Sequence, residues 1–143
     1  MNSYLLVIVF FLLLLPSLFM QPVSAQTITR APTNGAVGTA VTITGSAFLP
    51  NVPATVFYDG LQVGNTTTSS IGGFKVIFAV PSSSRGVHNI WAIDGVNNVS
   101  NTFTVTSSLI RAPTSGIVGT TITLTGYGFA ASSLIGVKWD GIT

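Results

Sequence analysis

The sequence is short of the side chains that carry most enzyme chemistry. Its 143 residues include no cysteine, no glutamate and a single histidine, His88, and charged residues make up only 6% of the chain. Without cysteine there can be no disulfide, no thiol nucleophile and no zinc site built on thiolates. Few groups remain that could act as general acids or bases. We therefore expect no catalytic residue, no metal site and no cofactor.

Basic residues are also few. Five lysine and arginine residues give a net charge of +2, and no two of them are adjacent. Proteins that bind nucleic acid usually gather basic residues into a patch or stripe, so we expect no nucleic-acid partner. Glycine, serine, threonine and β-branched residues are abundant instead, which is typical of a chain rich in strands and turns.

The first 25 residues have the pattern of a secretory signal peptide. The apolar run from Leu5 to Leu15 is eleven residues long, which is too short for a bilayer span of about 20 residues but suits a signal-peptide core. Val23-Ser24-Ala25 predicts cleavage before Gln26. The segment before the run carries no lysine or arginine, so an uncleaved N-terminal anchor is the alternative. Both interpretations predict a secreted or cell-surface protein.

The chain repeats itself at an offset of 81 residues. Aligned without a gap, residues 30–60 and 111–141 are identical at 15 of 31 positions. A fixed period of this kind indicates an array of similar folding units. We place a first unit at residues 26–107 and the start of a second, incomplete unit at residues 108–143. The second unit lacks counterparts of residues 63–107, so either this is a fragment of a longer polypeptide or a partner chain supplies the strands.

Alternating apolar and polar residues predict an all-β fold. Val41 and Ile43 share one strand face, and Asp59-Gly60 is a strong signal for a two-residue hairpin. Seven short strands are expected, at residues 27–30, 40–45, 54–58, 61–63, 74–80, 87–93 and 101–106. This spacing predicts an immunoglobulin-like β-sandwich in each complete unit.

The two copies also predict which side chains face inward. Val56 is retained as Val137, whereas Phe57 is replaced by Lys138, so we expect Val56 and Tyr58 to face the core and Phe57 to lie partly outward. Strand parity extends the expected core of the first unit to Val41, Ile43, Phe48, Val56, Phe74, Val76, Phe78 and Phe103.

One set of motifs points to a known family. The pattern is Pro32-x-x-Gly35-x-x-Gly38-Thr39-x-x-Thr42-Ile43-x-Gly45-x-x-Phe48, followed by Val56 and Asp59-Gly60. It resembles the start of an IPT/TIG domain, and the later half of the first unit, Gly73-Phe74 to Phe103-Thr104-Val105, is similar to immunoglobulin-like repeats of prokaryotic surface proteins. The resemblance covers essentially all of the chain after the leader.

The resemblance implies a non-enzymatic extracellular module that acts as a structural spacer or an adhesive surface. Its partners would be neighbouring repeats of the same polypeptide and a surface protein or polysaccharide. A membrane would be contacted only through an uncleaved leader or a C-terminal anchor. In such modules the glycines and the phenylalanine are scaffold features, so no catalytic residue is carried over.

Two further kinds of site are candidates. Asn65-Thr66-Thr67 and Asn98-Val99-Ser100 match the acceptor pattern for N-glycosylation. Trp91 and Tyr127 could stack on sugar rings, so the alternative function is an accessory carbohydrate-binding module of a secreted enzyme.

The aspartates and the histidine do not form a pattern that predicts a metal site or a catalytic site. Asp59, Asp94 and Asp140 each precede a glycine, which is typical of turns. His88 and Asp94 would lie about 20 Å apart on one extended segment, too far for a catalytic pair.

Overall fold

The computed structural model describes residues 24–140, and it is all-β. The expected signal peptide, apart from Ser24 and Ala25, lies outside the described residues. The strands are β1 (Thr27–Ala31), β2 (Asn34–Gly35), β3 (Ala40–Ser46), β4 (Pro53–Tyr58), β5 (Leu61–Thr67), β6 (Phe74–Ala79), β7 (Gly86–Ile93), β8 (Asn98–Val105), β9 (Ser108–Ala112) and β10 (Thr123–Tyr127). Within residues 24–140, no helix is long and apolar enough to cross a membrane.

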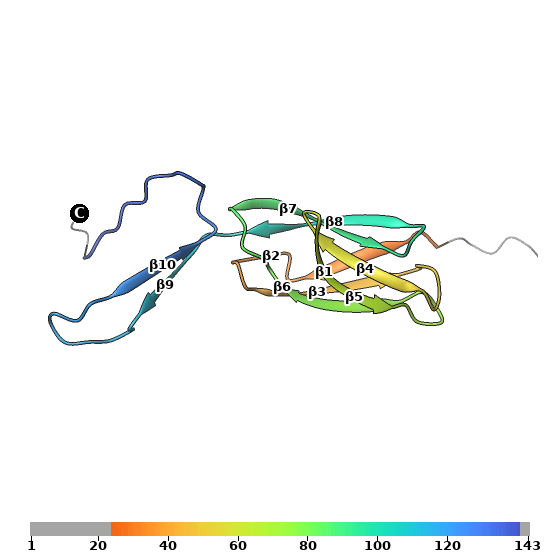
Figure 1. Ribbon diagram of the computed structural model, residues 1–143, viewed down its shortest axis with the longest axis horizontal. Coiled ribbons are helices and arrows are strands. Elements are labelled where there is room, and N and C mark those ends of the chain that lie inside the picture. The colour runs from red at the N-terminus through yellow and green to blue at the C-terminus, as the bar shows by residue number, and fades with distance from the viewer. Residues whose placement is uncertain (1–23, 141–143) are drawn as a thin grey trace, which may run out of the picture.

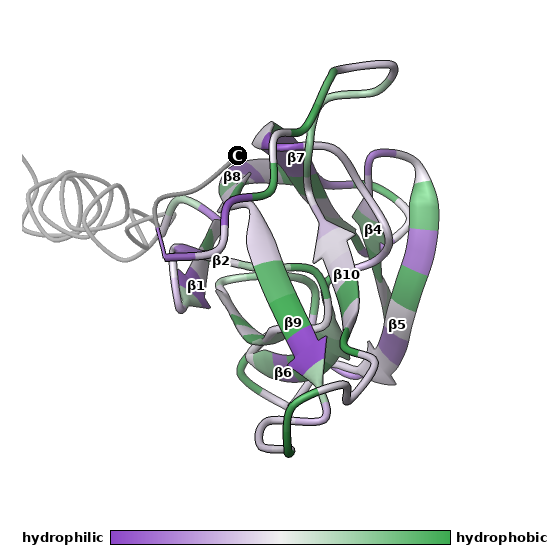
Figure 2. Ribbon diagram, turned by 90° about the vertical axis from the view of Figure 1, so that its left-hand side faces the viewer, coloured by the Kyte–Doolittle hydropathy of each residue, from purple (hydrophilic) through white to green (hydrophobic). Residues whose placement is uncertain are grey.

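Strands β1 to β8 form two sheets that enclose one core. One sheet has the order β1-β3-β6 and the other the order β2-β8-β7-β4-β5. All pairs are antiparallel except the short β2–β8 pair. Seen along the long axis of the molecule, the strands surround a common interior (Figure 2). Each of the seven strands expected from the sequence is present, and β2 is an addition.

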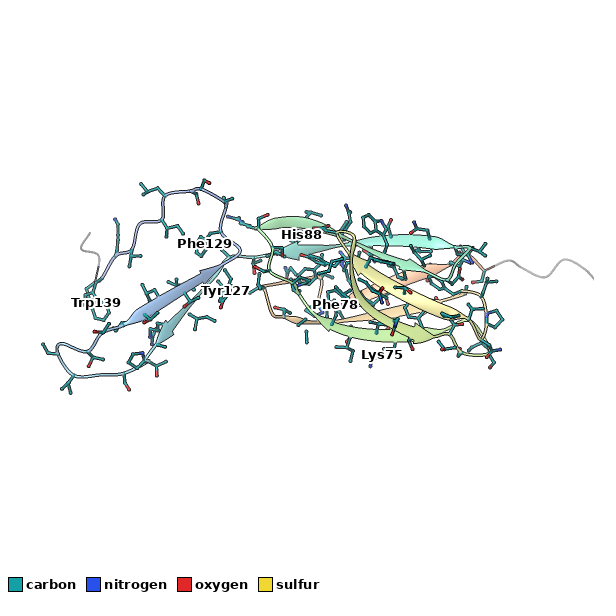
Figure 3. The ribbon with its side chains drawn as sticks, in the orientation of Figure 1. Lys75, Phe78, His88, Tyr127, Phe129 and Trp139 are labelled. Carbon is teal, nitrogen blue, oxygen red and sulfur yellow. The ribbon has the colours of Figure 1, made fainter. Side chains whose placement is uncertain are left out.

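The core lies between the two sheets, as strand parity predicts. All eight side chains expected in it are buried, and Val56 and Tyr58 face inward while Phe57 is only half-buried. On β6, Phe78 points between the sheets and Lys75 points away from them (Figure 3). Tyr58 packs edge-on against Phe78 with 6.1 Å between the ring centroids.

The Asp59-Gly60 hairpin forms as expected, but the strand that follows it is irregular. Asp59 and Gly60 have φ angles of 46° and 87°, the left-handed pair that a tight turn between twisted strands requires. The β4–β5 register then shifts between Val56 and Phe57. This irregularity turns Gly64 toward β6, where an added Cβ would lie 2.5 Å from Val76 Cγ1. The sequence therefore shows no clean alternation across β5, and the expected strand ended too early at residue 63.

A polar contact joins the two sheets along one side. The Asn101 side chain on β8 donates a 2.9 Å hydrogen bond to the carbonyl oxygen of Ile28 on β1. Arg30 on β1 donates to the amide oxygen of Asn101. Because β1 and β8 belong to different sheets and are not paired through their backbones, these side-chain hydrogen bonds link the two sheets.

The β9–β10 hairpin repeats the β1–β3 pairing residue for residue. Thr27 is opposite Ser46 and Ala31 is opposite Thr42 in the first pair, and Ser108 is opposite Tyr127 and Ala112 is opposite Thr123 in the second. Each position differs by 81. The backbone repeats too, since Gly38 and Gly119 have φ angles of 84° and 89°, Asn51 and Ser132 of 56° and 57°, and Asp59 and Asp140 of 46° and 45°.

The second hairpin projects from the sandwich at the end opposite the start of β1 (Figure 1). Its apolar side chains have no second sheet to pack on in the part of the chain that the structure describes. Ile122 and Leu124 are each 40% exposed, Val137 is 60% exposed and Trp139 is 69% exposed, while Phe129 is half-buried.

We expect Phe78→Ala to lower the free energy of unfolding of the first unit by about 3–5 kcal/mol, because it empties the centre of a packed core. A unit of this size has a total stability of about 4–12 kcal/mol, so the loss is a large fraction of it. The matched control is Ile77→Ala on the same strand, whose side chain is 60% exposed and should cost about 0.5 kcal/mol. Urea melts measure both, and a loss below about 1 kcal/mol for Phe78→Ala would contradict the packing.

Candidate functional site

The outer face of the five-stranded sheet brings together residues that sequence reasoning treated separately. Across β4, β7 and β8, Phe57 is opposite Trp91, and Trp91 is opposite Ser100. The neighbouring row runs from Asn65 through Thr55 and Ile93 to Asn98. Both glycosylation acceptors therefore flank one aromatic pair.

Both acceptor asparagines can be reached from solvent. Asn65 and Asn98 are exposed, as are the hydroxyl residues Thr67 and Ser100 that complete the two motifs. Adjacent strands are about 4.8 Å apart, so the two asparagines, three strand spacings from each other, are separated by about 14 Å. Glycosylation of either residue stays a prediction that the exposed positions allow.

Trp91 and Tyr127 do not form a shared platform for a sugar. Trp91 lies on β7 in the first unit and is half-buried beside Phe57, whereas Tyr127 lies on β10 and is 39% exposed. The aromatic partner of Trp91 was missed from the sequence because it depends on the β4–β7 register, which no local pattern encodes. Carbohydrate stacking on Trp91 and Tyr127 stays a prediction, and Phe57 lies opposite Trp91 in the β4–β7 register.

His88 belongs to a polar cluster at one end of the sandwich. Its Nδ1 lies 2.5 Å from Asp59 Oδ2, and its Nε2 lies 2.9 Å from the carbonyl oxygen of Ser84. The ring stacks on Tyr58 with 5.2 Å between centroids. The second oxygen of Asp59 accepts a 2.8 Å bond from the backbone N–H of Asn89. Gly86 on β7 is opposite Val105, so this is the end from which the chain leaves for β9 (Figure 3).

The geometry favours a positively charged His88. An ionised carboxylate and a carbonyl only accept hydrogen bonds, and only the imidazolium has an N–H group on each ring nitrogen to donate to both of them. Burial works against that charge, but the bonds to Asp59 and Ser84 outweigh it and raise the pKa of His88. Burial likewise works against the charge of Asp59, but the bonds from His88 and Asn89 lower its pKa. The pair joins the hairpin turn to the loop before β7.

Asp94 closes the turn between β7 and β8 and is not a partner of His88. Its carboxylate accepts bonds from the backbone N–H groups of Leu49, Val96 and Asn97 and from the Asn97 side chain, at 2.8–3.2 Å. Burial alone would raise the pKa of Asp94, but these four bonds lower it to about 2. Both oxygens of the Asp94 carboxylate therefore accept hydrogen bonds that hold the turn against the loop that carries Leu49.

Among residues 24–140, no group of three or more histidine and carboxylate side chains could hold a metal ion. The three aspartates lie apart, each at its own turn. Two of them, Asp59 and Asp140, adopt the same left-handed backbone, as the interpretation of Asp-Gly as turn chemistry predicts.

Comparisons with known proteins add little. No protein-family model matches the chain, and no curated protein does. Among solved structures, a protein named "Putative phosphatase" from Bacteroides thetaiotaomicron is similar at a TM-score of 0.39 and 23% identity, over 64% of this chain and 20% of that one. The chain thus spans about a fifth of that protein, and the match is too weak to carry an argument.

We expect the contribution of His88 to stability to fall as the pH rises. Because its folded pKa is raised above the unfolded value of about 6.5, the stabilisation is fully present below pH 6 and is lost as the pH passes through the folded pKa. Urea melts of the unmodified chain and of His88→Gln between about pH 5 and pH 9 measure this. The difference between them should shrink with rising pH, and a constant difference would show that His88 is not charged in the fold.

Proposed function

We propose that the chain is a non-enzymatic extracellular module of tandem immunoglobulin-like repeats of the IPT/TIG type. It serves as a spacer or an adhesive surface in a secreted or cell-surface protein. The first repeat spans residues 26–107 and the second begins at residue 108. The observation that carries the proposal is the recurrence, at an offset of 81, of sequence, strand register and turn backbone together.

The short junction between the units supports the spacer role. Only Thr106 and Ser107 separate β8 from β9. The Ser107 hydroxyl donates a 2.9 Å hydrogen bond to the carbonyl oxygen of Gly128, just after β10. Gly128 has a φ of 68°, and an added Cβ would lie 3.0 Å from the carbonyl oxygen of Thr106. A two-residue connection held by a hydrogen bond from the Ser107 side chain to the backbone of the second unit fixes direction better than a flexible linker does.

The chemistry of the first unit is compatible with a non-enzymatic role. The two carboxylates at its turns are engaged by several donors each, and its histidine has both nitrogens bonded. These groups stabilise loops, and a catalytic role would require them to exchange those bonds for substrate.

We expect the two units to keep a fixed separation. The chain has no cysteine, so Thr44→Cys and Thr125→Cys place spin labels at equivalent exposed positions of the two units. Pulsed electron resonance should give one narrow distance distribution. Gly128→Val should broaden it at least about twofold, since the side chain is disfavoured at this φ and meets the connector.

The control for that experiment is Gly136→Val, where an added Cβ meets nothing within 4 Å and the distribution should stay narrow. A broad distribution in the chain without Gly128→Val would show a flexible tether and contradict the spacer role.

We expect the exported protein to begin at Gln26. Ala25 is exposed, and β1 starts only at Thr27, so the bond to be cleaved lies in accessible chain just before the sandwich. N-terminal sequencing of protein secreted with its own leader measures this. Exported protein that begins at Met1 would contradict cleavage and favour the anchor.

A further inference from the structure

The outer face of the five-stranded sheet is neutral and has apolar side chains at its centre. Strands β4, β5, β7 and β8 contain no lysine, arginine, aspartate or glutamate. Phe57 and Trp91 are opposite each other on this face, Ile93 follows Trp91 two residues along β7, and all three are half-buried. This surface has no charged group for an ionic ligand. It suits the apolar face of a sugar ring, because the negative face of an aromatic ring attracts C–H groups.

Amide and hydroxyl side chains surround the apolar centre. They lie at the ends of the two central rows and in the row beyond, and they are Gln62, Asn65, Asn98, Ser100, Asn89 and Thr102. Amides and hydroxyls both donate and accept hydrogen bonds, as the hydroxyls of a neutral sugar do. The face therefore combines an apolar seat with a neutral polar rim.

Asn98 is the glycosylation acceptor next to the tryptophan. It lies opposite Ile93, and Ser100, the hydroxyl residue of its motif, lies opposite Trp91. Asn98 and Trp91 are therefore diagonal neighbours on adjacent strands, about 7–8 Å apart and within reach of a long side chain. Asn98 is exposed and has the same outward parity as Ser100. A sugar attached to its amide starts beside the indole ring.

We propose that Asn98 carries an N-linked glycan whose first sugar packs on the ring of Trp91 and covers the apolar centre of this face. The proposal rests on the proposed extracellular location, since the Asn-x-Ser/Thr motif is modified in secreted proteins. The sugar shields Trp91 and Phe57 from solvent, and its outer hydroxyls keep the face soluble.

The occupant is the glycan of the chain itself, and two features favour it over a free saccharide. Sites for free small ligands are usually concave, whereas this seat lies on the face of a sheet. Attachment one row away holds the sugar at an effective concentration of about millimolar or more, so a weak attraction is enough to seat it. A free saccharide has no such advantage.

The test uses residues 26–143, secreted from a eukaryotic host behind the leader of that host. Trp139→Phe, at a position that is 69% exposed, leaves Trp91 as the only tryptophan. An endoglycosidase trims each glycan to one N-acetylglucosamine, and the intact mass gives the occupancy of each acceptor. With Asn65→Gln, only Asn98 carries a sugar. Acrylamide should then quench Trp91 fluorescence at least about twofold less than in the same variant made without glycan, because the sugar covers the ring.

Asn98→Gln is the matched control. It leaves one sugar on Asn65 of β5, which is separated from β7 by β4, so quenching of Trp91 should equal that of the chain without glycan. Nuclear Overhauser contacts between the sugar C–H groups and the Trp91 ring should appear with Asn65→Gln and be absent with Asn98→Gln. Both measurements keep Trp91 in place, so neither requires a substitution at the centre of the sheet.

Three outcomes would overturn the proposal. They are an unmodified Asn98 in the secreted chain, equal quenching of Trp91 with and without the sugar on Asn98, or saturation of the unglycosylated chain by free diacetylchitobiose below about 1 mM. The last outcome would assign the face to an external saccharide. The host supplies the leader and the junction between the units is not probed, so this test can fail while the proposed spacer function stands. Export by the leader of the chain and the spin-label distances test that function without any glycan.

Discussion

Face-to-face packing of the three-stranded and five-stranded sheets is the interaction on which the rest of the molecule depends. The side chains that are fully buried at its centre, among them Ile43, Ile90 and Phe103, come from both sheets. Burying such side chains stabilises the fold by about 1.5–3 kcal/mol each. This packing sets the inward parity of every long strand, and the turns are placed where the chain must cross between the sheets or reverse within one.

The few charged and hydrogen-bonding side chains of the first unit stabilise this packing at the edges and ends of the sandwich. Asn101 and Arg30 join the two sheets along one side, Asp94 holds the turn at one end, and His88 with Asp59 ties a hairpin to a loop at the other. A sandwich with so few charges has few means of fixing its loops, so each of these groups has several partners. Within residues 24–140, one buried side-chain nitrogen lacks a hydrogen-bond partner, Nε of Arg30, although the same guanidinium donates to Asn101.

Much of this fold could be predicted from two signals in the sequence, the alternation of apolar and polar residues and the internal repeat. Neither signal depends on which distant strands come into contact. Alternation gave the strands and the inward faces, so Val41, Ile43 and Phe78 could be assigned to the core without knowing what they contact. Alternation alone did not show which of Val56, Phe57 and Tyr58 face the core. Comparison of the two copies predicted that Val56 and Tyr58 face inward and that Phe57 lies partly outward. The Asp59-Gly60 turn is equally local, since it depends on two residues and their backbone.

Contacts that depend on register between distant strands could not be predicted in the same way. His88 meets Asp59 only because β7 lies beside β4 with Ile90 opposite Tyr58, and Phe57 meets Trp91 for the same reason. The irregularity at Gly64 in β5 was missed because it depends on the close approach of Gly64 to Val76 on the other sheet, which the local sequence does not encode. Candidate sites in this protein arise from such pairings, so sequence reasoning placed their members but not their partners.

The two copies also differ in an informative way. The inward positions keep their character, with Val41, Ile43 and Gly45 matched by Ile122, Leu124 and Gly126. Two outward positions change class, since the half-buried Phe57 becomes the exposed Lys138 and the exposed Ser46 becomes Tyr127, whereas the exposed Thr44 stays threonine as Thr125. A spacer role depends on the sheet geometry, which is repeated, whereas an adhesive role depends on the outer surface, which is repeated only in part. If the units bind ligands through their outer faces, each unit must therefore bind by different contacts, and the aromatic pair of Phe57 and Trp91 belongs to the first unit alone, since the position of Phe57 holds a lysine in the second.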